Sequence, residues 1–425
     1  MTESKNEPEQ HGGQELIVVC NSGSTSAKLA IFSADSVSAS DKPLWKAVLK
    51  KHADKSVQVE IHGSSAESKL EIPGEDITQV IETALQSAWS GPTAIAKDDS
   101  NVRAVGHRIV HGGTYFSEPT LVTERVLEQL HELYELAPLH QPAGVECVKL
   151  ASRIFPNAKQ IAVFDTSYFH GMAPEATIYP VPYEWHEKHG IRRYGFHGIN
   201  HQYCSRKAAE MTAKPISEFR VVTCHLGGGA SMAATNNGHA VATTMGFTPL
   251  DGLMMGTRSG EIDPGIILYL LENQKYTSQQ IDHALNYDSG LKGVSEISSD
   301  VEQLQNLSSD GNKRAQLALS IYIRSISGHL GSLLTTMNGA DAVVFSAGVG
   351  ENSSYIREEV TKRLTFTGIV CDTTSNEAPS HDDREISART SIIHILVINA
   401  QEEWMIAKEC VRLLENAPAE TPSRS

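Results

Sequence analysis

Short apolar runs and longer amphipathic stretches alternate along most of this chain. Apolar runs of four to eight residues predict buried strands, whereas apolar positions three or four residues apart predict helices. In the first half of the chain, this pattern predicts strands at 16–20, 28–32, 102–110 and 160–165 and helices at 76–89 and 124–137. The turn at 21–26 makes the first two strands a hairpin, and residues 33–71 are interpreted as a variable, polar stretch.

The second half continues the alternation and repeats its opening. Strands are predicted at 219–224, 232–234, 239–243, 342–346 and 391–398, with alternating elements through 262–286 and helices at 312–338 and 402–415. An apolar strand, a Gly/Ser turn and a second strand occur near residue 16 and again near residue 219, which suggests a duplicated domain. The expected fold is therefore α/β, with two similar domains and a cleft between them.

The polar N-terminus and C-terminus set the limits of the predicted domains. We expect disordered tails at 1–15 and 416–425, an N-terminal domain formed by 16–166 plus 403–415, and a C-terminal nucleotide-binding domain at 167–402. No apolar run approaches the roughly 20 residues that span a bilayer.

The charge balance narrows the classes of partner. The chain has 36 basic and 51 acidic residues and a net charge of -15, which disfavours nucleic acid and anionic membranes as main partners. The six cysteines are scattered without a CxxC spacing. This argues against a disulfide framework or a zinc site and fits a reducing cytoplasm.

Three glycine-rich turns follow apolar strands: NSGSTS from Asn21, HLGGG from His225 and AGVGEN from Ala347. Glycine lets backbone N–H groups approach an anion closely, so such turns suit phosphate groups. A tight structural turn is the alternative for any one of them. Three in one chain favour nucleotide binding, although neither the P-loop sequence nor GxGxxG occurs.

Nine motifs occur together in one order: NSGSTSAK, HRIVHGG, APLHQP, FDTSYFH, RRYGFHG, CHLGGGAS, GFTPLDGLMMGTRSGEIDP, AGVGEN and QEEWMIA. In this combination, from about Leu16 to Leu414, the chain resembles the acetate kinase family. The resemblance implies two duplicated domains of the type shared by sugar kinases, the Hsp70 ATPase domain and actin. It also implies a homodimer that transfers the γ-phosphoryl group of ATP directly, in line, to acetate, giving acetyl phosphate and ADP. The expected cofactor is Mg²⁺, with Mn²⁺ as the alternative.

Two arginines are the first candidates for catalysis. Arg108 in HRIVHGG and Arg258 in GTRSG each lie beside glycine or histidine, and arginine binds carboxylate or phosphate in bidentate fashion. A surface ion pair is the ordinary alternative for a lone arginine. By resemblance, Arg108 would hold the substrate carboxylate and Arg258 would stabilise charge on the transferring phosphoryl group.

Four further residues are candidates for orientation and metal binding. By resemblance, His197 would stabilise the transition state and Asp165 would orient groups or handle a proton; a structural histidine and a capping aspartate are the alternatives. Asn21 and Glu402 are the candidate Mg²⁺ ligands, because Mg²⁺ prefers oxygen and keeps several waters. For Glu402, stabilisation of a helix N-terminus is a strong alternative.

The resemblance also assigns two binding sets. The acyl pocket would be lined by Val110, Leu139, His140, Phe196 and Pro249. The nucleotide set would contain Lys28, His225, Leu226, Gly227, Gly228, Gly229, Asp300, Val301, Glu302, Gly348, Val349, Gly350, Glu351 and Asn352. Gly228 departs from the asparagine common in the family, which removes a side-chain amide near the phosphates. Small residues at Gly348 and Val349 argue against a pyrophosphate-dependent relative.

Three alternatives remain open at this point. The nearest is a propionate or butyrate kinase, because one methylene changes binding by only about 1–3 kcal/mol. The second is a nucleotide-dependent binding module without an acyl acceptor, against which Arg108 and Arg258 argue. The third is a carboxylate-binding regulator that has lost catalysis, which is disfavoured because every proposed catalytic position is filled.

Overall fold

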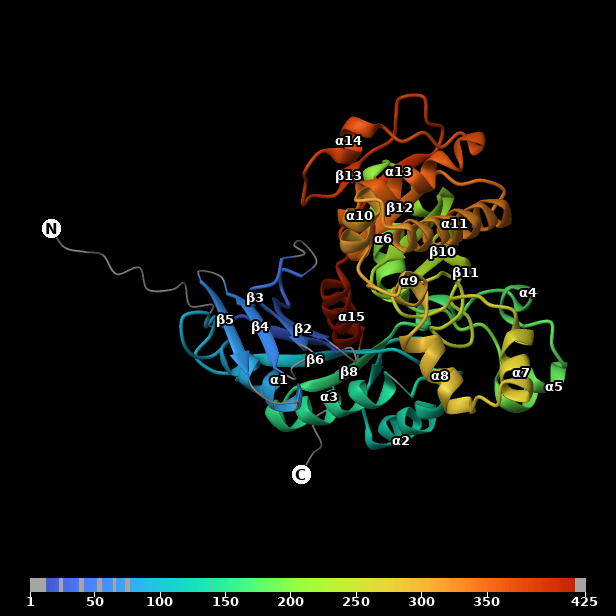
Figure 1. Cartoon of the computed structure of the whole chain (residues 1–425). Coiled ribbons are helices and arrows are strands. Elements are labelled where there is room, and N and C mark those ends of the chain that lie inside the picture. Colours follow the sequence, from blue (N-terminus) through green and yellow to red (C-terminus); the bar gives the residue numbers. More distant parts are fainter. Residues whose placement is uncertain are drawn as a thin grey trace. The chain divides into compact units, whose positions relative to one another are not determined.

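The computed structural model describes residues 13–22, 26–37, 42–51, 56–63, 66–72, 77–138 and 140–416. The chain divides into two compact units, one formed by Met1–Ser167 with Gln401–Ser425 and the other by Tyr168–Ala400 (Figure 1). Most of both predicted tails lies outside the described residues. None of the helices formed by the described residues combines the length and the apolar character of a membrane span.

The first unit is built on an eight-stranded sheet with the order β5-β4-β3-β2-β1-β6-β8-β7. Its strands are β1 (Leu16–Ser22), β2 (Ser26–Ser33), β3 (Trp45–Lys51), β4 (Val57–His62), β5 (Glu67–Ile72), β6 (Val102–Ile109), β7 (Thr120–Leu121) and β8 (Lys159–Phe164). Its helices are α1 (Ile77–Gln86), α2 (Glu124–Glu132), η1 (Leu133–Glu135), α3 (Gln141–Ile154) and α15 (Glu402–Asn416).

Helices cover both faces of the β1–β6 region of this sheet. Successive side chains of a strand point to opposite faces. A side chain at Gly106 would meet Ile406 and Cys410 of α15, whereas Ile109 lies against Gly144 of α3. Thus α15 packs on one face and α3 on the other (Figure 1). The α3 face belongs to an apolar core that includes Val18, Cys20 and Trp45.

The second unit contains a six-stranded sheet with the order β11-β10-β9-β12-β14-β13. Its strands are β9 (Arg220–Leu226), β10 (Ala230–Asn236), β11 (His239–Thr243), β12 (Ala342–Ser346), β13 (Arg384–Glu385) and β14 (His394–Val397). Its first helices are α4 (Pro174–Thr177), α5 (Tyr183–His189), α6 (Gly198–Met211), η3 (Ile216–Glu218), α7 (Pro264–Asn273), α8 (Ser278–Tyr287) and α9 (Gly290–Ser295). The remaining ones are α10 (Val301–Ser309), α11 (Lys313–Thr336), α12 (Ala347–Asn352), α13 (Ser354–Lys362), η4 (Thr365–Thr367) and α14 (Thr373–Glu377), while η2 (Ser167–Phe169) begins at the boundary of the units.

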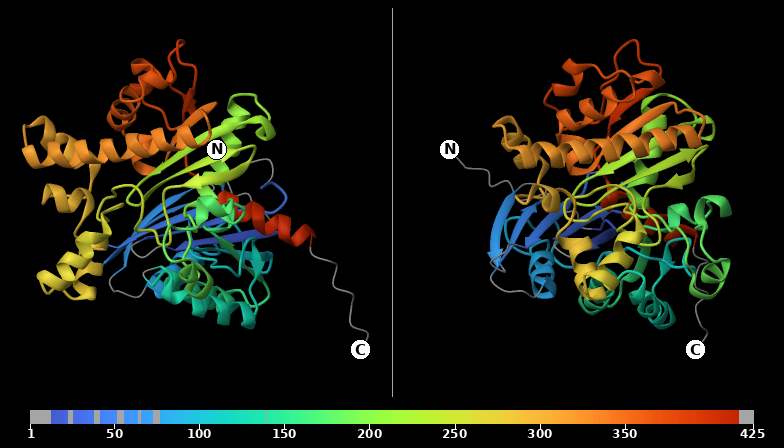
Figure 2. Two further views of the ribbon diagram at one scale, coloured as in Figure 1. Left: turned by 90° about the vertical axis from the view of Figure 1, so that its right-hand side faces the viewer. Right: turned by 45° about the vertical axis from the view of Figure 1, so that its right-hand side comes forward.

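Two helices enclose the central strands of the second sheet. Thr223 of β9 contacts His201 of α6 through a 2.7 Å hydrogen bond, and the strand also packs against α11. Figure 2 shows the long helix α11 running across this sheet.

The two sheets share a five-strand pattern, and the predicted duplication is confirmed. In the first sheet, β3, β2 and β1 are antiparallel neighbours, and β6 and β8 then continue in parallel. In the second sheet, β11, β10 and β9 are antiparallel, and β12 and β14 continue in parallel. The predicted α/β class with two similar domains therefore holds.

Four local expectations were wrong or incomplete. The stretch at 33–71 contains β3, β4 and β5. Burial alternates along β3 and β4, whereas β5 is mostly exposed. AGVGEN is the short helix α12 rather than a turn, although Ala347 has a left-handed φ of 64° where the strand gives way to it. Helices α3 and α6 were not predicted, and the last long strand is shorter than expected at His394–Val397.

Candidate active site

Arg108 and Asp165 meet at the carboxyl ends of two parallel strands. Arg108 lies near the end of β6, and Asp165 directly follows β8, its neighbour in the sheet. The guanidinium Nε donates to both carboxylate oxygens of Asp165 at 3.1 Å, and Nη2 donates to Oδ2 at 2.6 Å. The Asp165 side chain is 1% exposed, so this ion pair fixes the direction of the guanidinium in a protected position.

Asn21 extends this cluster to the start of α15. Asn21 is the last residue but one of β1, the other neighbour of β6, and its Oδ1 accepts a hydrogen bond from Arg108 Nη1 at 3.2 Å. Its Nδ2 donates to Glu402 Oε2 at 2.9 Å and to Glu403 Oε1 at 2.6 Å. Both glutamates lie in the first turn of α15, where the helix dipole favours negative charge.

The charges of this cluster are unequal. Among the described residues joined by these hydrogen bonds, three carboxylates meet one guanidinium. Burial alone would lower the pKa of Arg108, but the negative charges of Asp165 and Glu402 outweigh burial and raise that pKa above its ordinary value. The guanidinium thus stays charged, and the surplus of oxygen donors suits a hard divalent cation.

Lys28 lies beside this cluster, and the described first-unit residues of the acyl set lie directly after β6 and directly before α3. Lys28 Nζ is 3.8 Å from Glu403 Oε1, and its side chain is half exposed. Val110 directly follows β6 and is half-buried, while His140 precedes the first turn of α3. Leu139 lies outside the described residues.

In the second unit, His197 and His225 form a stacked pair. His197 has a left-handed φ of 57° at the start of α6, and its ring lies 4.1 Å from the ring of His225 with an interplanar angle of 10°. The Nδ1 atom of His197 is 2.9 Å from Ser231 Oγ. Asn200 Nδ2 lies 2.8 Å from His225 Nδ1 and donates to Ser346 Oγ at 3.2 Å, so the second histidine is tied to β12.

Arg258 and His197 converge on the second glycine-rich turn. Gly227 N donates to Gly229 O at 2.9 Å, which closes a tight turn after β9. A Cβ placed on Gly229 would lie 3.6 Å from His197 Nε2 and 3.7 Å from Arg258 Nη1. Burial lowers the pKa of Arg258 from its ordinary value, although the guanidinium remains a cation near pH 7.

Two contacts link the second glycine-rich turn to the segments that carry the other predicted nucleotide-binding residues. The backbone N of Gly256 donates to Gly228 O at 3.3 Å, and a Cβ on Gly256 would touch Ser299, next to Asp300. A Cβ on Gly227 would lie 3.7 Å from the Cβ of Ala347. The turn therefore has the start of α10 on one side and the start of α12 on the other.

Within these two helix starts, the predicted residues differ in exposure. Asp300 caps α10 and Glu302 is exposed, while Val301 is buried. Gly348 and Asn352 are exposed, Val349 and Glu351 are half-buried, and Gly350 is buried. The Glu351 carboxylate accepts from the backbone N of Ala347 and of Ala400, both at 2.8 Å, so it also braces α12.

Phe196, Leu226 and Pro249 also belong to the second unit. Phe196 and Leu226 are buried, and the backbone O of Pro249 accepts from Arg258 Nη1 at 3.3 Å. Pro249 therefore helps to orient the guanidinium of Arg258.

Three polar residues of these clusters were missed in the sequence. Glu403 shares Asn21 with Glu402, and its adjacency to Glu402 was the only signal for it. Asn200 and Ser231 hold the two stacked histidines. Asn200 lies two residues after RRYGFHG and Ser231 is the last residue of CHLGGGAS, but nothing in a single sequence separates them from ordinary polar residues.

Comparison with known proteins gives one consistent family. The model of the acetokinase family matches residues 16–408. Acetate kinase of Gloeothece citriformis is 42% identical over 398 residues, which cover 93% of this chain and 98% of that protein. The crystal structure of Porphyromonas gingivalis acetate kinase has a TM-score of 0.85 and 35% identity, covering 94% of this chain and 100% of the other. A propionate kinase from Francisella tularensis has a TM-score of 0.82 and 34% identity, with coverage of 93% and 98%.

Proposed function

Because this chain belongs to the acetokinase family, we propose that its Arg108 cluster binds the acetate carboxylate and its Arg258 cluster stabilises the transferring phosphoryl group. The reaction is that of an acetate kinase: it moves the γ-phosphoryl group reversibly between ATP and acetate. The observation that carries the proposal is the bidentate ion pair of Arg108 with Asp165, which holds a guanidinium rigidly beside Asn21 and Glu402.

The acceptor needs a fixed cation and no base. Acetate is ionised at pH 7, so its oxygen attacks the γ-phosphorus directly while the bond from that phosphorus to the ADP oxygen breaks. Arg108 offsets the repulsion between acetate and the phosphates, and Asp165 orients Arg108 rather than removing a proton. We propose that half-buried Val110 borders the methyl group and that acetate is preferred to propionate.

Asn21 and Glu402 would hold the Mg²⁺ ion. The surplus of carboxylate oxygens at the start of α15 fits a hard cation that takes oxygen ligands and keeps several waters. When bound, the ion would neutralise charge on the phosphate oxygens. Asn21 also accepts a hydrogen bond from Arg108. The same amide would therefore hold the metal ligands and the acetate-binding arginine in fixed positions relative to one another.

We assign to Arg258 and His197 the stabilisation of the negative charge on the transferring phosphoryl group. Both lie beside Gly229, whose missing side chain leaves the turn open to an anion. Positioned donors of this kind lower the barrier because their dipoles are already aligned before the reaction. For the donor we propose ATP, with Gly227–Gly229 at the phosphates; a Cβ on Gly228 would meet no atom within 4 Å, so the glycine leaves space that an asparagine would fill.

A homodimer and a cytoplasmic location complete the proposal. Four large apolar side chains on α7 are exposed, namely Ile266, Leu268, Tyr269 and Leu271. Exposed apolar patches of this kind mark protein interfaces, so α7 is the candidate surface for a second copy. Six free cysteines, five of them buried, suit a reducing compartment.

An ADP-release assay with a ladder of acids tests the proposed substrate. We expect kcat/KM to fall from acetate to propionate and again to butyrate, with Mg²⁺ required throughout. Inorganic pyrophosphate in place of ATP should give no acyl phosphate. A higher kcat/KM for propionate than for acetate would identify the chain as a propionate kinase instead. Formation of acyl phosphate with pyrophosphate but not with ATP would contradict the proposed donor.

A further inference from the structure

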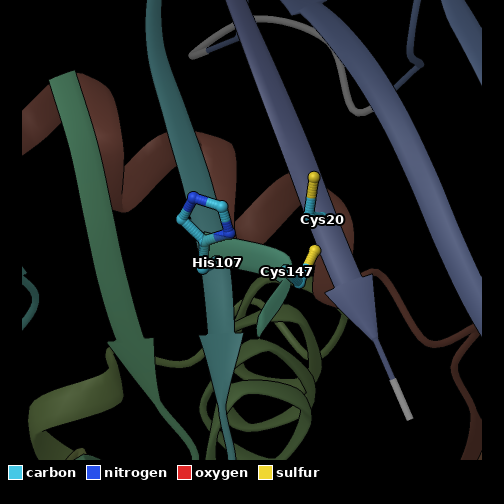
Figure 3. Close-up of side chains that lie close together, drawn as sticks. All are labelled: Cys20, His107 and Cys147. Carbon is cyan, nitrogen blue, oxygen red and sulfur yellow. The ribbon is translucent and has the colours of Figure 1, made fainter. Parts of the chain in front are cut away.

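Two cysteines and a histidine meet inside the first unit, away from the oxygen cluster. Cys20 lies on β1, His107 on β6 and Cys147 on α3, and one ligand atom of each lies within 4.8 Å of the other two. Their exposed fractions are 1%, 1% and 6%. Figure 3 shows the two sulfur atoms and the imidazole ring close together beside the strands that carry Cys20 and His107.

A neighbouring amide fixes the form of the histidine. The Nε2 atom of His107 lies 2.8 Å from Gln160 Oε1. The amide nitrogen of Gln160 donates to the backbone O of Ala158 at 3.2 Å, which places its oxygen toward the ring. Gln160 can then only accept, so Nε2 carries the proton and Nδ1 keeps its lone pair.

That lone pair has no oxygen or nitrogen donor among the described residues. Nδ1 of His107 is buried and meets no partner with full hydrogen-bond geometry in this part of the chain, which is unusual for a buried polar atom. The neighbouring group that interacts with this imidazole is the thiol of Cys147. An imidazole that donates one N–H to an oxygen acceptor and keeps the other nitrogen bare is the arrangement found in metal-binding histidines. The cysteines supply two sulfur atoms close by.

We propose that Cys20, Cys147 and His107 bind one monovalent copper ion. Thiolate ligands select soft ions such as Cu(I), whereas the oxygen ligands around Asn21 suit Mg²⁺. A structural zinc site is four-coordinate, and the group found among the described residues has three members. On binding, the two thiols lose their protons and the histidine coordinates through its bare Nδ1.

The copper site and the oxygen cluster occupy opposite faces of the same strands. Cys20 precedes Asn21 on β1, and His107 precedes Arg108 on β6, so their side chains point to different faces. Copper binding is therefore independent of the proposed acetate and Mg²⁺ sites, and its test succeeds or fails without reference to them.

The test is an anaerobic titration of the reduced, metal-free full chain with Cu(I) in competition with a Cu(I) chelator. We expect one retained equivalent, and X-ray absorption of the complex should show sulfur and nitrogen neighbours. Failure of the wild-type chain to retain copper against a weak chelator would overturn the proposal, and so would tighter retention of Zn²⁺ than of Cu(I) under matched competition.

Variants locate the site. Cys147→Ser should lower the copper affinity by at least about 100-fold, and Gln160→Leu by about 10–100-fold because the imidazole loses its orienting partner. Cys204→Ser, a buried cysteine of the second unit, is the matched control and should keep the full equivalent. Equal retention by Cys147→Ser and Cys204→Ser would overturn the assignment; circular dichroism checks that each variant is folded.

Exposure of the metal-free chain to air tests whether Cys20 and Cys147 form a disulfide instead of binding copper. If free-thiol titration of the denatured wild-type chain shows two thiols lost without copper, and Cys147→Ser prevents the loss, Cys20 and Cys147 are a disulfide-forming pair. That result would overturn copper as the occupant.

Discussion

The two faces of β1 and β6 carry opposite chemistry only one residue apart. Toward α15 lie the amide of Asn21 and the guanidinium of Arg108, joined to carboxylates. Toward α3 lie the thiol of Cys20 and the imidazole of His107, beside Cys147. One face offers hard oxygen ligands and charge, and the other offers soft ligands within an apolar core.

The difference follows from what covers each face. The oxygen face meets the first turn of α15, whose free backbone N–H groups and dipole stabilise Glu402 and Glu403. The sulfur face meets the apolar side of α3, where charged groups are costly and thiols pack as small hydrophobes. The alternation of a strand thus allows a catalytic cluster and a sealed soft cluster to share the same backbone.

The largest expected effect is at Arg108. Arg108→Ala should lower kcat/KM for acetate by about 10³-fold, because the carboxylate loses the cation that offsets its repulsion from ATP. It also leaves Asp165 buried without its guanidinium, which should lower the free energy of unfolding by about 3 kcal/mol or more. Steady-state kinetics and urea unfolding measure the two effects, and near-normal kinetics would break the assignment of the oxygen face.

Asp165→Asn should have the next largest effect. The amide keeps the size of the side chain but loses the charge and one acceptor, so Arg108 stays cationic without a fixed direction. We expect kcat/KM for acetate to fall by about 10²-fold. Because Asp165 is assigned to orientation, the pH profile should keep its shape; loss of the fall in activity on the acidic side would indicate a proton-handling role.

Glu402→Gln sharpens the choice between neighbouring carboxylates. Loss of a metal ligand should raise the Mg²⁺ concentration needed for half-maximal activity by about 10–100-fold. Glu403→Gln is the matched variant and should raise it less, since Glu403 also lies 3.8 Å from Lys28. The reverse order in Mg²⁺ titrations would transfer the ligand role to Glu403.

Cys147→Ser should have the smallest effect on catalysis. Serine keeps the shape of the side chain on the α3 face, so kcat/KM for acetate should change by less than about 3-fold while copper binding is lost. A loss of activity comparable to that of Asp165→Asn, in a variant with normal circular dichroism, would show that the two faces are not independent.

Local patterns predicted the strands that carry both faces, because β1 and β6 are apolar runs that end in polar motifs. The motifs also supplied Asn21, Arg108, Asp165 and Glu402, which the fold brings together from distant positions. The soft cluster was beyond such patterns, since Cys20, His107 and Cys147 share no local spacing and only the packing of α3 on the sheet joins them. Helix α3 itself was missed because it follows Pro138 and contains Pro142 and Gly144, which weaken its pattern.

The most direct test of the account is ADP release by the wild-type chain and by Arg108→Ala, measured with MgATP while acetate is varied. The account predicts that release by the wild-type chain requires both acetate and Mg²⁺ and that Arg108→Ala nearly abolishes the acetate-dependent part. ADP release that is independent of acetate, or equal in the two proteins, would contradict the assignment of the oxygen face as the acetate site.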